Sequence, residues 1–334
     1  STVQDRHTHA TRGIDELYRS FAVEAGATSP TWQRLCAWIA QTPSVLGRLD
    51  TLPGGKRQPN LLLGAIRLLD GPTDPDADFE DWFAEYWPAL REIVLTHETQ
   101  TNEPGRCAVT APLLASLPQP VALLELGASA GLLLAPDRYR YRYEGDAVLF
   151  ADGPLAGPES PVLRCEVTGR LPGDPADLRV AHRRGLDLFP LDAVDPATAA
   201  WLRALVWPDE IEREARLTLA LDAVAADPVT VIRGDMLTGL DELLAGVPDG
   251  ATPVVQNAAA LAYLERDARA TLVARLADAG VRWISLEGAS VLPDVRERTA
   301  EWEPERRPHF VVALDGEPVG RCGPHGGWVE WVAG

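Results

Sequence analysis

One short segment near the middle of the chain combines small residues with an acidic side chain in a spacing that can hold a ligand. The apolar run 121–126 is followed at once by Gly127, Ser129 and Gly131, and Glu125 stands two residues before the first glycine. Small residues let a backbone turn pass close to a bound molecule, and a helix that begins there would offer unpaired N–H groups. The segment is therefore the first candidate for a binding or catalytic site.

Three kinds of site use a turn of this type. A dinucleotide site needs G-x-G-x-x-G, and here Ser129 and Leu132 replace the second and third glycines, so the match is poor. The nucleophile elbow of serine hydrolases, G-x-S-x-G, is matched literally by residues 127–131. The S-adenosylmethionine site of class I methyltransferases has an acidic residue before G-x-G-x-G, and only the middle glycine differs here.

The hydrolase interpretation needs a base and an acid later in the chain. Ser129 would be the nucleophile, Asp235 or Glu287 the acid, and His309 or His325 the base, in the chain order of the α/β-hydrolases. An elbow serine normally follows several strands of a sheet, whereas the residues before Ser129 have helical patterns. This conflict makes the hydrolase the second choice.

The methyltransferase interpretation gains support from acids that follow later apolar runs. Asp187 is suited to the ribose hydroxyls and Asp235 to the adenine amino group, because carboxylates accept hydrogen bonds from both. Asp187 lies 60 residues after Gly127, where about 20 is usual for a ribose-binding acid. Either 137–180 is an insertion, or Glu166 is the ribose acid. The candidate cofactor-binding residues are Glu125, Gly127, Ser129, Gly131, Asp187 and Asp235.

Other polar residues are candidates for contact with a substrate. The candidate catalytic residues are Glu287, Tyr263 and Asn257. A dense polar segment precedes the glycine turn, and its candidate substrate-binding or lid residues are Gln100, Asn102, Glu103 and Arg106. Loop segments of this composition often carry function. The alternative is a buried polar network that ties the preceding segment to the sheet.

The elements that must position these residues change in character along the chain. Residues 1–115 carry apolar side chains at three-to-four spacing, which predicts helices. From about residue 116, apolar runs alternate with helical patterns, which predicts βαβ units and a mostly parallel sheet that ends in an antiparallel hairpin. We therefore expect an α/β fold with a helical N-terminal domain over 1–115. A Rossmann-like domain of the class I methyltransferase type is expected over 116–334, with an irregular insertion at about 137–180.

Composition limits the partners. The chain has 49 acidic and 31 basic side chains and a net charge of −18, which disfavours nucleic acid and anionic membranes as partners. The alternation of Arg and Tyr over 138–143 is the one basic and aromatic segment, and an amphipathic strand with arginines paired to carboxylates explains it better than nucleic-acid stacking.

Cysteine and histidine usage adds expectations about location and metals. The four cysteines are far apart, which predicts reduced thiols in a cytoplasmic protein. The most apolar stretch, 108–136, is interrupted by prolines and an acid, so no membrane span is expected. His7 and His9 have no second ligand pair nearby, so no metal is expected. The cysteines are Cys36, Cys107, Cys165 and Cys322.

Several motifs together resemble one bacterial family. They are TQTNEPGRC at 99–107, LELGASAGL at 124–132, DRY at 137–139, PNLL at 59–62, WLRALVWP at 201–208 and SLEG at 285–288. They resemble the bacterial domain-of-unknown-function family 2332 over nearly the whole chain. The resemblance implies a helical N-terminal part and a methyltransferase-like Rossmann domain, and it implies no known reaction. The family usually has Asn where this chain has Leu133, and His-Ser where it has Asn257-Ala258.

The leading expectation is an S-adenosylmethionine-dependent methyltransferase-like enzyme that acts on a small molecule. The first alternative is a serine hydrolase that uses Ser129. The second is a ligand-binding protein that keeps the fold without catalysis. The sequence predicts neither the substrate nor the oligomeric state.

Overall fold

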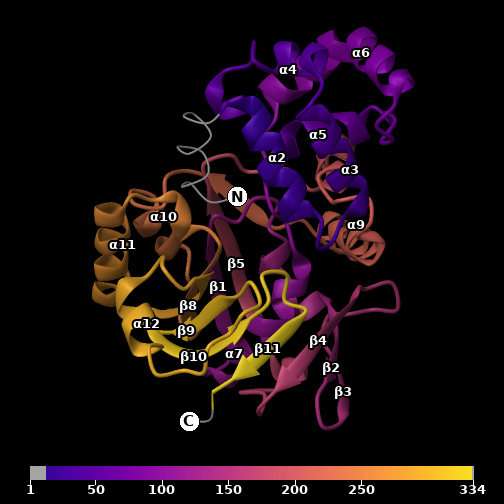
Figure 1. Cartoon of the computed structure of the whole chain (residues 1–334). Helices are drawn as coiled ribbons and strands as arrows, with labels where there is room; N and C mark the ends of the chain where they lie inside the picture. The colour runs from indigo at the N-terminus through magenta and orange to yellow at the C-terminus, as the bar shows by residue number, and fades with distance from the viewer. Residues whose placement is uncertain (1–12, 333–334) are drawn as a thin grey trace. The chain divides into compact units, whose positions relative to one another are not determined.

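The computed structural model describes residues 13–332, and the chain forms two compact units (Figure 1). The first unit contains the chain up to Thr101 together with Pro196–Ala215, and the second contains Asn102–Asp195 and the chain from Arg216 onward. The expected domain boundary at residue 115 stays a prediction, because a compact unit is not by itself a segment that folds independently.

The first unit is built from helices, as the apolar spacing predicted. Its core holds the aromatic side chains of Trp32, Phe79 and Phe83, all of them buried. The Ser29 hydroxyl accepts a hydrogen bond from the Trp32 N–H and begins one helix. The elements are α2 Ile14–Ala25, α3 Pro30–Ile39, α4 Pro43–Leu49, η1 Gly54–Lys56, α5 Pro59–Leu68, α6 Ala77–Thr96, α8 Pro196–Ala204 and the start of α9 Ile211–Ala226.

The second unit contains the strands and the remaining helices. The strands are β1 Val121–Leu126, β2 Arg140–Glu144, β3 Val148–Asp152, β4 Val162–Thr168, β5 Val180–Asp187, β6 Thr230–Arg233, β7 Thr252–Ala258, β8 Arg282–Gly288, β9 Phe310–Leu314, β10 Glu317–Cys322 and β11 Trp328–Trp331. The helices are η2 Pro104–Arg106, α7 Cys107–Ser116, η3 Leu132–Leu134, η4 Pro136–Arg138, η5 Pro175–Asp177, α10 Leu240–Ala245, η6 Leu261–Tyr263, α11 Arg266–Asp278 and α12 Pro293–Arg298.

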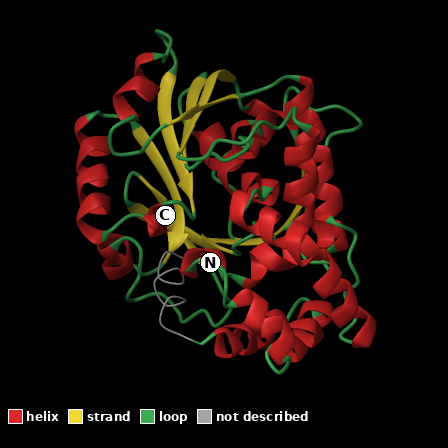
Figure 2. Cartoon of the chain, turned by 90° about the horizontal axis from the view of Figure 1, so that it is seen from above, coloured by secondary structure: helices red, strands yellow, loops and turns green. Residues whose placement is uncertain are grey.

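The strands of the described chain form one twisted, mostly parallel sheet (Figure 2). Their order is β3-β2-β4-β11-β10-β9-β8-β7-β1-β5-β6. The pairs β1–β5, β1–β7, β5–β6 and β7–β8 are parallel, whereas β8–β9 and β9–β10 are antiparallel. The mixed α/β class, the mostly parallel sheet and the antiparallel hairpin near the C-terminus are therefore confirmed.

The strand directions bring several chain segments to one edge of the sheet, which we call the carboxyl edge. The parallel strands β1, β5, β6, β7 and β8 end there. Because β9 runs against β8 and β10 runs against β9, β10 also ends at this edge. The glycine turn 127–131 and the β10–β11 loop, residues 323–327, therefore lie at the same edge.

The segment 137–180, expected to be irregular, contains three strands of the sheet. After the glycine turn the chain forms β2, β3 and β4, of which β4 pairs with β11. It then returns to form β5 beside β1. This excursion accounts for the spacing of 60 residues between Gly127 and Asp187, because a three-stranded extension stands between two neighbouring strands.

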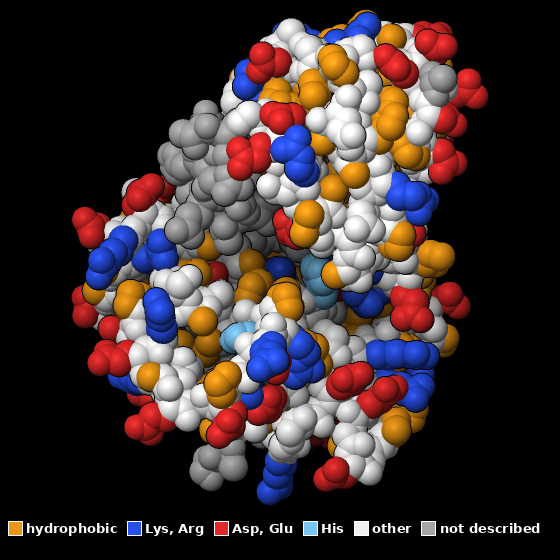
Figure 3. Space-filling view, in the orientation of Figure 1, with side chains coloured by type: hydrophobic (Ala, Val, Ile, Leu, Met, Phe, Trp, Pro, Cys, Tyr) orange, Lys and Arg blue, Asp and Glu red, His pale blue; other side chains and the backbone are white. Residues whose placement is uncertain are grey.

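Strand β2 shows the alternation that the Arg and Tyr pattern predicted. Tyr141 and Tyr143 are buried, so their rings are not available for stacking on nucleic acid. Arg140 and Arg142 lie on the other face and form ion pairs with Asp152 and a glutamate of the same strand. On the face shown in Figure 3, arginines are likewise interspersed with acidic side chains.

Two further expectations concern side chains and membrane spans. All four cysteines are unpaired and buried, as predicted. Between residues 13 and 332, no helix is long and apolar enough to cross a membrane. No group of three or more metal-ligating side chains occurs in that range, and His7 and His9 lie outside it.

Candidate functional site

The glycine turn after β1 requires its glycines. Gly127 and Gly131 have φ values of 74° and 78°, in the left-handed region that favours glycine. A Cβ atom on Gly131 would lie 2.3 Å from the side chain of Val229, and one on Gly127 would lie 2.7 Å from Ala260. The turn is thus fixed by backbone conformation and by close packing.

Backbone carbonyl groups already bind three N–H groups of this turn. The amides of Gly127 and Ala128 donate to the carbonyl of Leu186 at 2.8 and 3.2 Å. The amide of Gly131 donates to the carbonyl of Ala128 at 2.7 Å. These bonds tie the turn to the end of β5, so the three amides are engaged within the protein.

Side chains bind the other two N–H groups. The amide of Ser129 donates to Asp187 Oδ2 at 2.8 Å, and the amide of Ala130 donates to Asn102 Oδ1 at 3.1 Å. Every amide of residues 127–131 therefore has an acceptor within the chain. A phosphate group placed here would have to displace one of these bonds.

The sequence predicted that the turn would begin a helix, and this prediction is wrong. The turn leads into the single 3₁₀ turn η3, followed by η4. Pro136 gives the physical reason, because it has no N–H to donate to the carbonyl of Leu132 four residues earlier. The turn consequently lacks the helix N-terminus that favours anions in dinucleotide sites.

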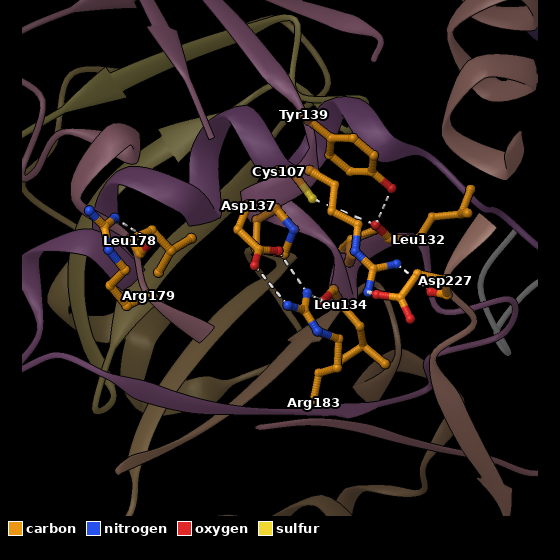
Figure 4. A network of polar contacts seen from close by, with 12 residues as sticks. Cys107, Leu132, Leu134, Asp137, Tyr139, Leu178, Arg179, Arg183 and Asp227 are labelled. Carbon is orange, nitrogen blue, oxygen red and sulfur yellow. Dashed lines mark hydrogen bonds and ion pairs between the residues drawn. The ribbon is translucent and has the colours of Figure 1, made fainter. Parts of the chain in front are cut away.

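Side chains from elsewhere bind the carbonyl groups that a helix would have used, and Figure 4 shows those of Leu132 and Leu134. The carbonyls of residues 132, 133 and 134 accept hydrogen bonds in turn from Tyr139 Oη at 2.7 Å, Gln256 Nε2 at 2.9 Å and Arg183 Nη1 at 2.8 Å. Each buried acceptor is therefore satisfied without a helix.

A buried ion pair holds the segment after the turn against β5. The carboxylate of Asp137 accepts two hydrogen bonds from the guanidinium of Arg183, both at 2.7 Å, and 2% of its side chain is exposed (Figure 4). Arg138 also forms an ion pair with Asp227 at 2.7 Å. From the sequence, Asp137 stood out only as part of the DRY motif at 137–139, and Arg183 was not singled out.

Glu125 is the most unusual acid of the site. It is buried near the end of β1, and its Oε2 has no hydrogen-bond partner among the described residues. Gln256 stands beside it in the register of β7, and its Oε1 is likewise unpaired. Burial raises the pKa of the Glu125 carboxyl well above its usual value, the nearby Asp187 raises it further, and Arg106 and the neighbouring Gln256 side chain oppose the shift.

Asp187 and Asp235 lie at the carboxyl edge, at the ends of β5 and β6. Asp187 Oδ1 accepts from the Phe189 amide at 2.8 Å, in addition to the bond from Ser129. Asp235 Oδ1 accepts from the Leu237 amide at 2.7 Å. Both acids cap local turns, and each carboxylate oxygen keeps a second lone pair for another donor.

Glu166, the alternative ribose acid, lies on β4, and five strands separate β4 from β1 in the order of the sheet. Its amide donates to the carbonyl of Gly327, in the β10–β11 loop, at 2.9 Å. The sequence could not show this, because the place of β4 depends on its pairing with β2 and β11.

Arg106 is a buried cation at the carboxyl edge. Its Nε donates to the carbonyl of Pro324 at 2.8 Å, and its Nη1 donates to that of Ala258 at 3.3 Å. Its guanidinium lies 5.4 Å from the ring centre of Phe310. Arg106 therefore joins the polar segment before α7 to the ends of β7 and β10.

The rest of that polar segment forms buried contacts. Asn102 Nδ2 donates to Ser129 Oγ at 2.8 Å, so both ends of the amide hold the glycine turn. Glu103 is fully buried and accepts from Arg216 Nε and from the Gly105 amide, both at 2.9 Å. Gln100 belongs to the other compact unit. Arg216 was not considered from the sequence, since it lies in an ordinary helical pattern.

The three candidate catalytic residues are placed differently. Glu287 is buried at the end of β8, where its Oε1 accepts from Asn257 Nδ2 at 2.7 Å and from the amides of Ala260 and Leu261. Burial raises the pKa of Glu287. Asn257 Oδ1 accepts from an indole N–H at 2.7 Å. These two side chains shape the turn after β7, whereas Tyr263 is 46% exposed in η6.

The hydrolase residues have only some of the surroundings that a nucleophile elbow requires. Ser129 has φ of 51°, as a strained turn would require, but the helix of a nucleophile elbow is missing. Its hydroxyl accepts a hydrogen bond from Asn102 Nδ2 at 2.8 Å. Of the two candidate bases, His309 Nδ1 contacts the backbone carbonyl of Arg307 at 2.9 Å, and His325 Nδ1 lies 3.9 Å from Glu103 Oε2.

The fold and the site together define a mixed α/β protein with a buried acidic site at the carboxyl edge of a mostly parallel sheet. Residues 15–331 match the family described as uncharacterized protein conserved in bacteria, DUF2332, and the chain belongs to this family. No curated protein matches the chain, and no solved structure does.

Proposed function

We propose that the chain binds S-adenosylmethionine at the carboxyl edge and transfers its methyl group to a small molecule. The strand order β6-β5-β1-β7-β8 supports this proposal, since it corresponds to the order 3-2-1-4-5 of a Rossmann-like sheet. In such sheets the ligand lies where the order reverses, which is here between the ends of β1 and β7. Glu125 and Gln256 lie beside this point.

The observation that carries the proposal is the imbalance between donors and acceptors at this point. All amides of the turn are engaged, whereas Glu125 Oε2 and Gln256 Oε1 are buried and have no hydrogen-bond partner among residues 13–332. A ligand with hydrogen-bond donors and positive charge would satisfy them. S-adenosylmethionine carries an ammonium group, a sulfonium, two ribose hydroxyls and an amino group, and it has no phosphate.

Each acid has a distinct role in this proposal. Glu125 would hold the ammonium group, Asp187 the ribose hydroxyls and Asp235 the adenine amino group. When bound, S-adenosylmethionine supplies a methyl group on a positively charged sulfur. The chain's own contribution is to orient the two reactants and to exclude water, and orientation alone supplies a large part of the rate of such transfers.

Calorimetry of the full chain with S-adenosylmethionine and with its demethylated product tests the proposal. Glu125→Gln and Asp187→Asn are each expected to weaken binding by about 10- to 150-fold, because a hydrogen bond to a charged group contributes about 1.5–3 kcal/mol. Asp192→Asn is the matched control, because Asp192 caps the Val194 amide as Asp187 caps that of Phe189. No binding of either compound at millimolar concentration contradicts the proposal.

Two alternatives remain as outcomes of experiments. A fluorophosphonate that labels the wild type and not Ser129→Ala would favour a hydrolase. Binding of S-adenosylmethionine without turnover on any acceptor would favour a ligand-binding protein. A cytoplasmic location and the absence of nucleic-acid or membrane partners stay predictions from composition.

A further inference from the structure

A carboxylate–histidine pair lies next to the proposed cofactor site and has no role in cofactor binding. His325 Nδ1 lies 3.9 Å from Glu103 Oε2, and 44% of the histidine side chain is exposed while none of Glu103 is. This distance is too long for a direct hydrogen bond and short enough for the charge to act on the ring. A buried carboxylate facing one ring nitrogen is the arrangement that orients a general base.

The position of His325 is fixed by contacts between two backbone segments. A Cβ atom on Gly326 would lie 2.1 Å from the carbonyl oxygen of Gly105, and one on Gly105 would lie 2.4 Å from that of His325. Arg106 Nε also donates to the carbonyl of Pro324. The β10–β11 loop is therefore packed tightly against η2.

The same contacts connect His325 to the glycine turn. Asn102, the neighbour of Glu103, binds Ser129 and Ala130 of the turn. The β10–β11 loop ends at the carboxyl edge, where the turn lies. A side chain that is half exposed and fixed at this edge is placed to meet a second substrate that arrives from solvent.

We infer that His325 is the general base that takes the proton of the methyl acceptor, and that Glu103 is its positioning residue. This inference rests on the proposed function and names the substrate class: a small molecule whose accepting atom is a hydroxyl oxygen. The hydroxyl proton passes to His325 Nε2, the oxygen forms a bond to the methyl carbon, and the carbon–sulfur bond breaks with its electron pair left on sulfur. A hydroxyl needs such a base because its oxygen is a weak nucleophile while it keeps its proton.

The charges around the ring decide which nitrogen carries the proton of the neutral form. Glu103 faces Nδ1, and Arg216 of α9 binds Glu103. Arg106 of η2 and Glu166 of β4 are further charged residues on elements that bind the same loop, at Pro324 and Gly327. A carboxylate beside Nδ1 stabilises the tautomer with the proton on Nδ1. That tautomer leaves the lone pair of Nε2 to accept a proton.

Nitrogen-15 NMR of the full chain, labelled at the histidine rings, reads this tautomer directly. His325 is assigned by the loss of its signals in His325→Asn. We expect the proton of the neutral ring on Nδ1 and a shift toward the other tautomer in Glu103→Gln. His309 is the internal control, because its Nδ1 faces the Arg307 carbonyl, and its tautomer should not change.

The wild-type result alone can overturn the inference, even where Glu103→Gln does not fold. A neutral His325 with its proton on Nε2 cannot accept another proton there and refutes the role of base. Calorimetry of His325→Asn with S-adenosylmethionine separates the two proposals, because this variant should bind with wild-type affinity. If the wild type itself does not bind S-adenosylmethionine, the proposed function is refuted, whatever tautomer His325 has.

Discussion

Replacement of Arg183 by methionine tests the account of the segment after the glycine turn. The change leaves the Asp137 carboxylate, which is 2% exposed, without its two hydrogen bonds from the guanidinium. It also removes the donor to the Leu134 carbonyl. Breaking a buried ion pair on one side costs about 3–5 kcal/mol, because a charge stays buried without a partner.

Hydrogen exchange measured by mass spectrometry reports this loss of stability within the second compact unit, which contains Asp137 and Arg183. Amides of β1 and β5 that exchange through opening of the sheet should exchange about two to three and a half orders of magnitude faster in Arg183→Met, at about 1.4 kcal/mol for each tenfold change. The double variant Asp137→Asn with Arg183→Met should be less affected, because no charge is left buried.

Arg140→Met is the matched control for this experiment. Arg140 also pairs with an aspartate, but 37% of its side chain and 59% of that of Asp152 are exposed. Exposed pairs contribute about 0–1 kcal/mol. Equal effects of Arg183→Met and Arg140→Met on the exchange of β1 and β5 would refute the reasoning about the buried pair.

Two further predictions concern the glycine turn and Glu125. Gly131→Ala should lower the free energy of unfolding by about 2–4 kcal/mol, because Gly131 combines a positive φ with the close contact to Val229. Gly316→Ala, where φ is 80° and the surrounding space is open, should lower it by only about 1–2 kcal/mol. Equal losses of the two variants in chemical denaturation would contradict the contribution of packing at Gly131. Because the pKa of Glu125 is raised in the folded state, its ionisation destabilises the fold as the pH rises from about 4.5, the usual carboxyl value, toward the folded pKa. Glu125→Gln should therefore become more stable relative to the wild type as the pH rises through this window, and a difference independent of pH in thermal unfolding would contradict the buried carboxyl.

Local patterns in the sequence predicted the elements that bury one face or alternate along a strand. The apolar runs before Gly127 and Gly288 form β1 and β8, and the Arg and Tyr alternation forms β2 with its tyrosines buried. Asp187 and Asp235 follow strands that end at the same edge, as their positions in the chain indicated. These features depend on a continuous apolar run or on alternation within a strand, and a single segment shows either one.

The order of strands in the sheet could not be predicted in the same way. The place of β4 beside β11 depends on pairing between segments far apart in the chain, and this pairing places Glu166 beside the β10–β11 loop. The missing helix after the turn had a local signal in Pro136, which entered the sequence-based expectations only as the end of an apolar stretch. The pairing of Glu103 with His325 and Arg216 had no signal, because contacts of this length leave no spacing to recognise.

Calorimetry with S-adenosylmethionine in two buffers of different ionisation enthalpy tests the central claim most directly. We expect binding to release a proton at a pH below the raised pKa of Glu125, because a cationic ligand favours the ionised carboxylate. We also expect Glu125→Gln to bind more weakly and to release no proton. Absence of heat at millimolar ligand, or equal affinity and proton release in Glu125→Gln, would contradict the claim.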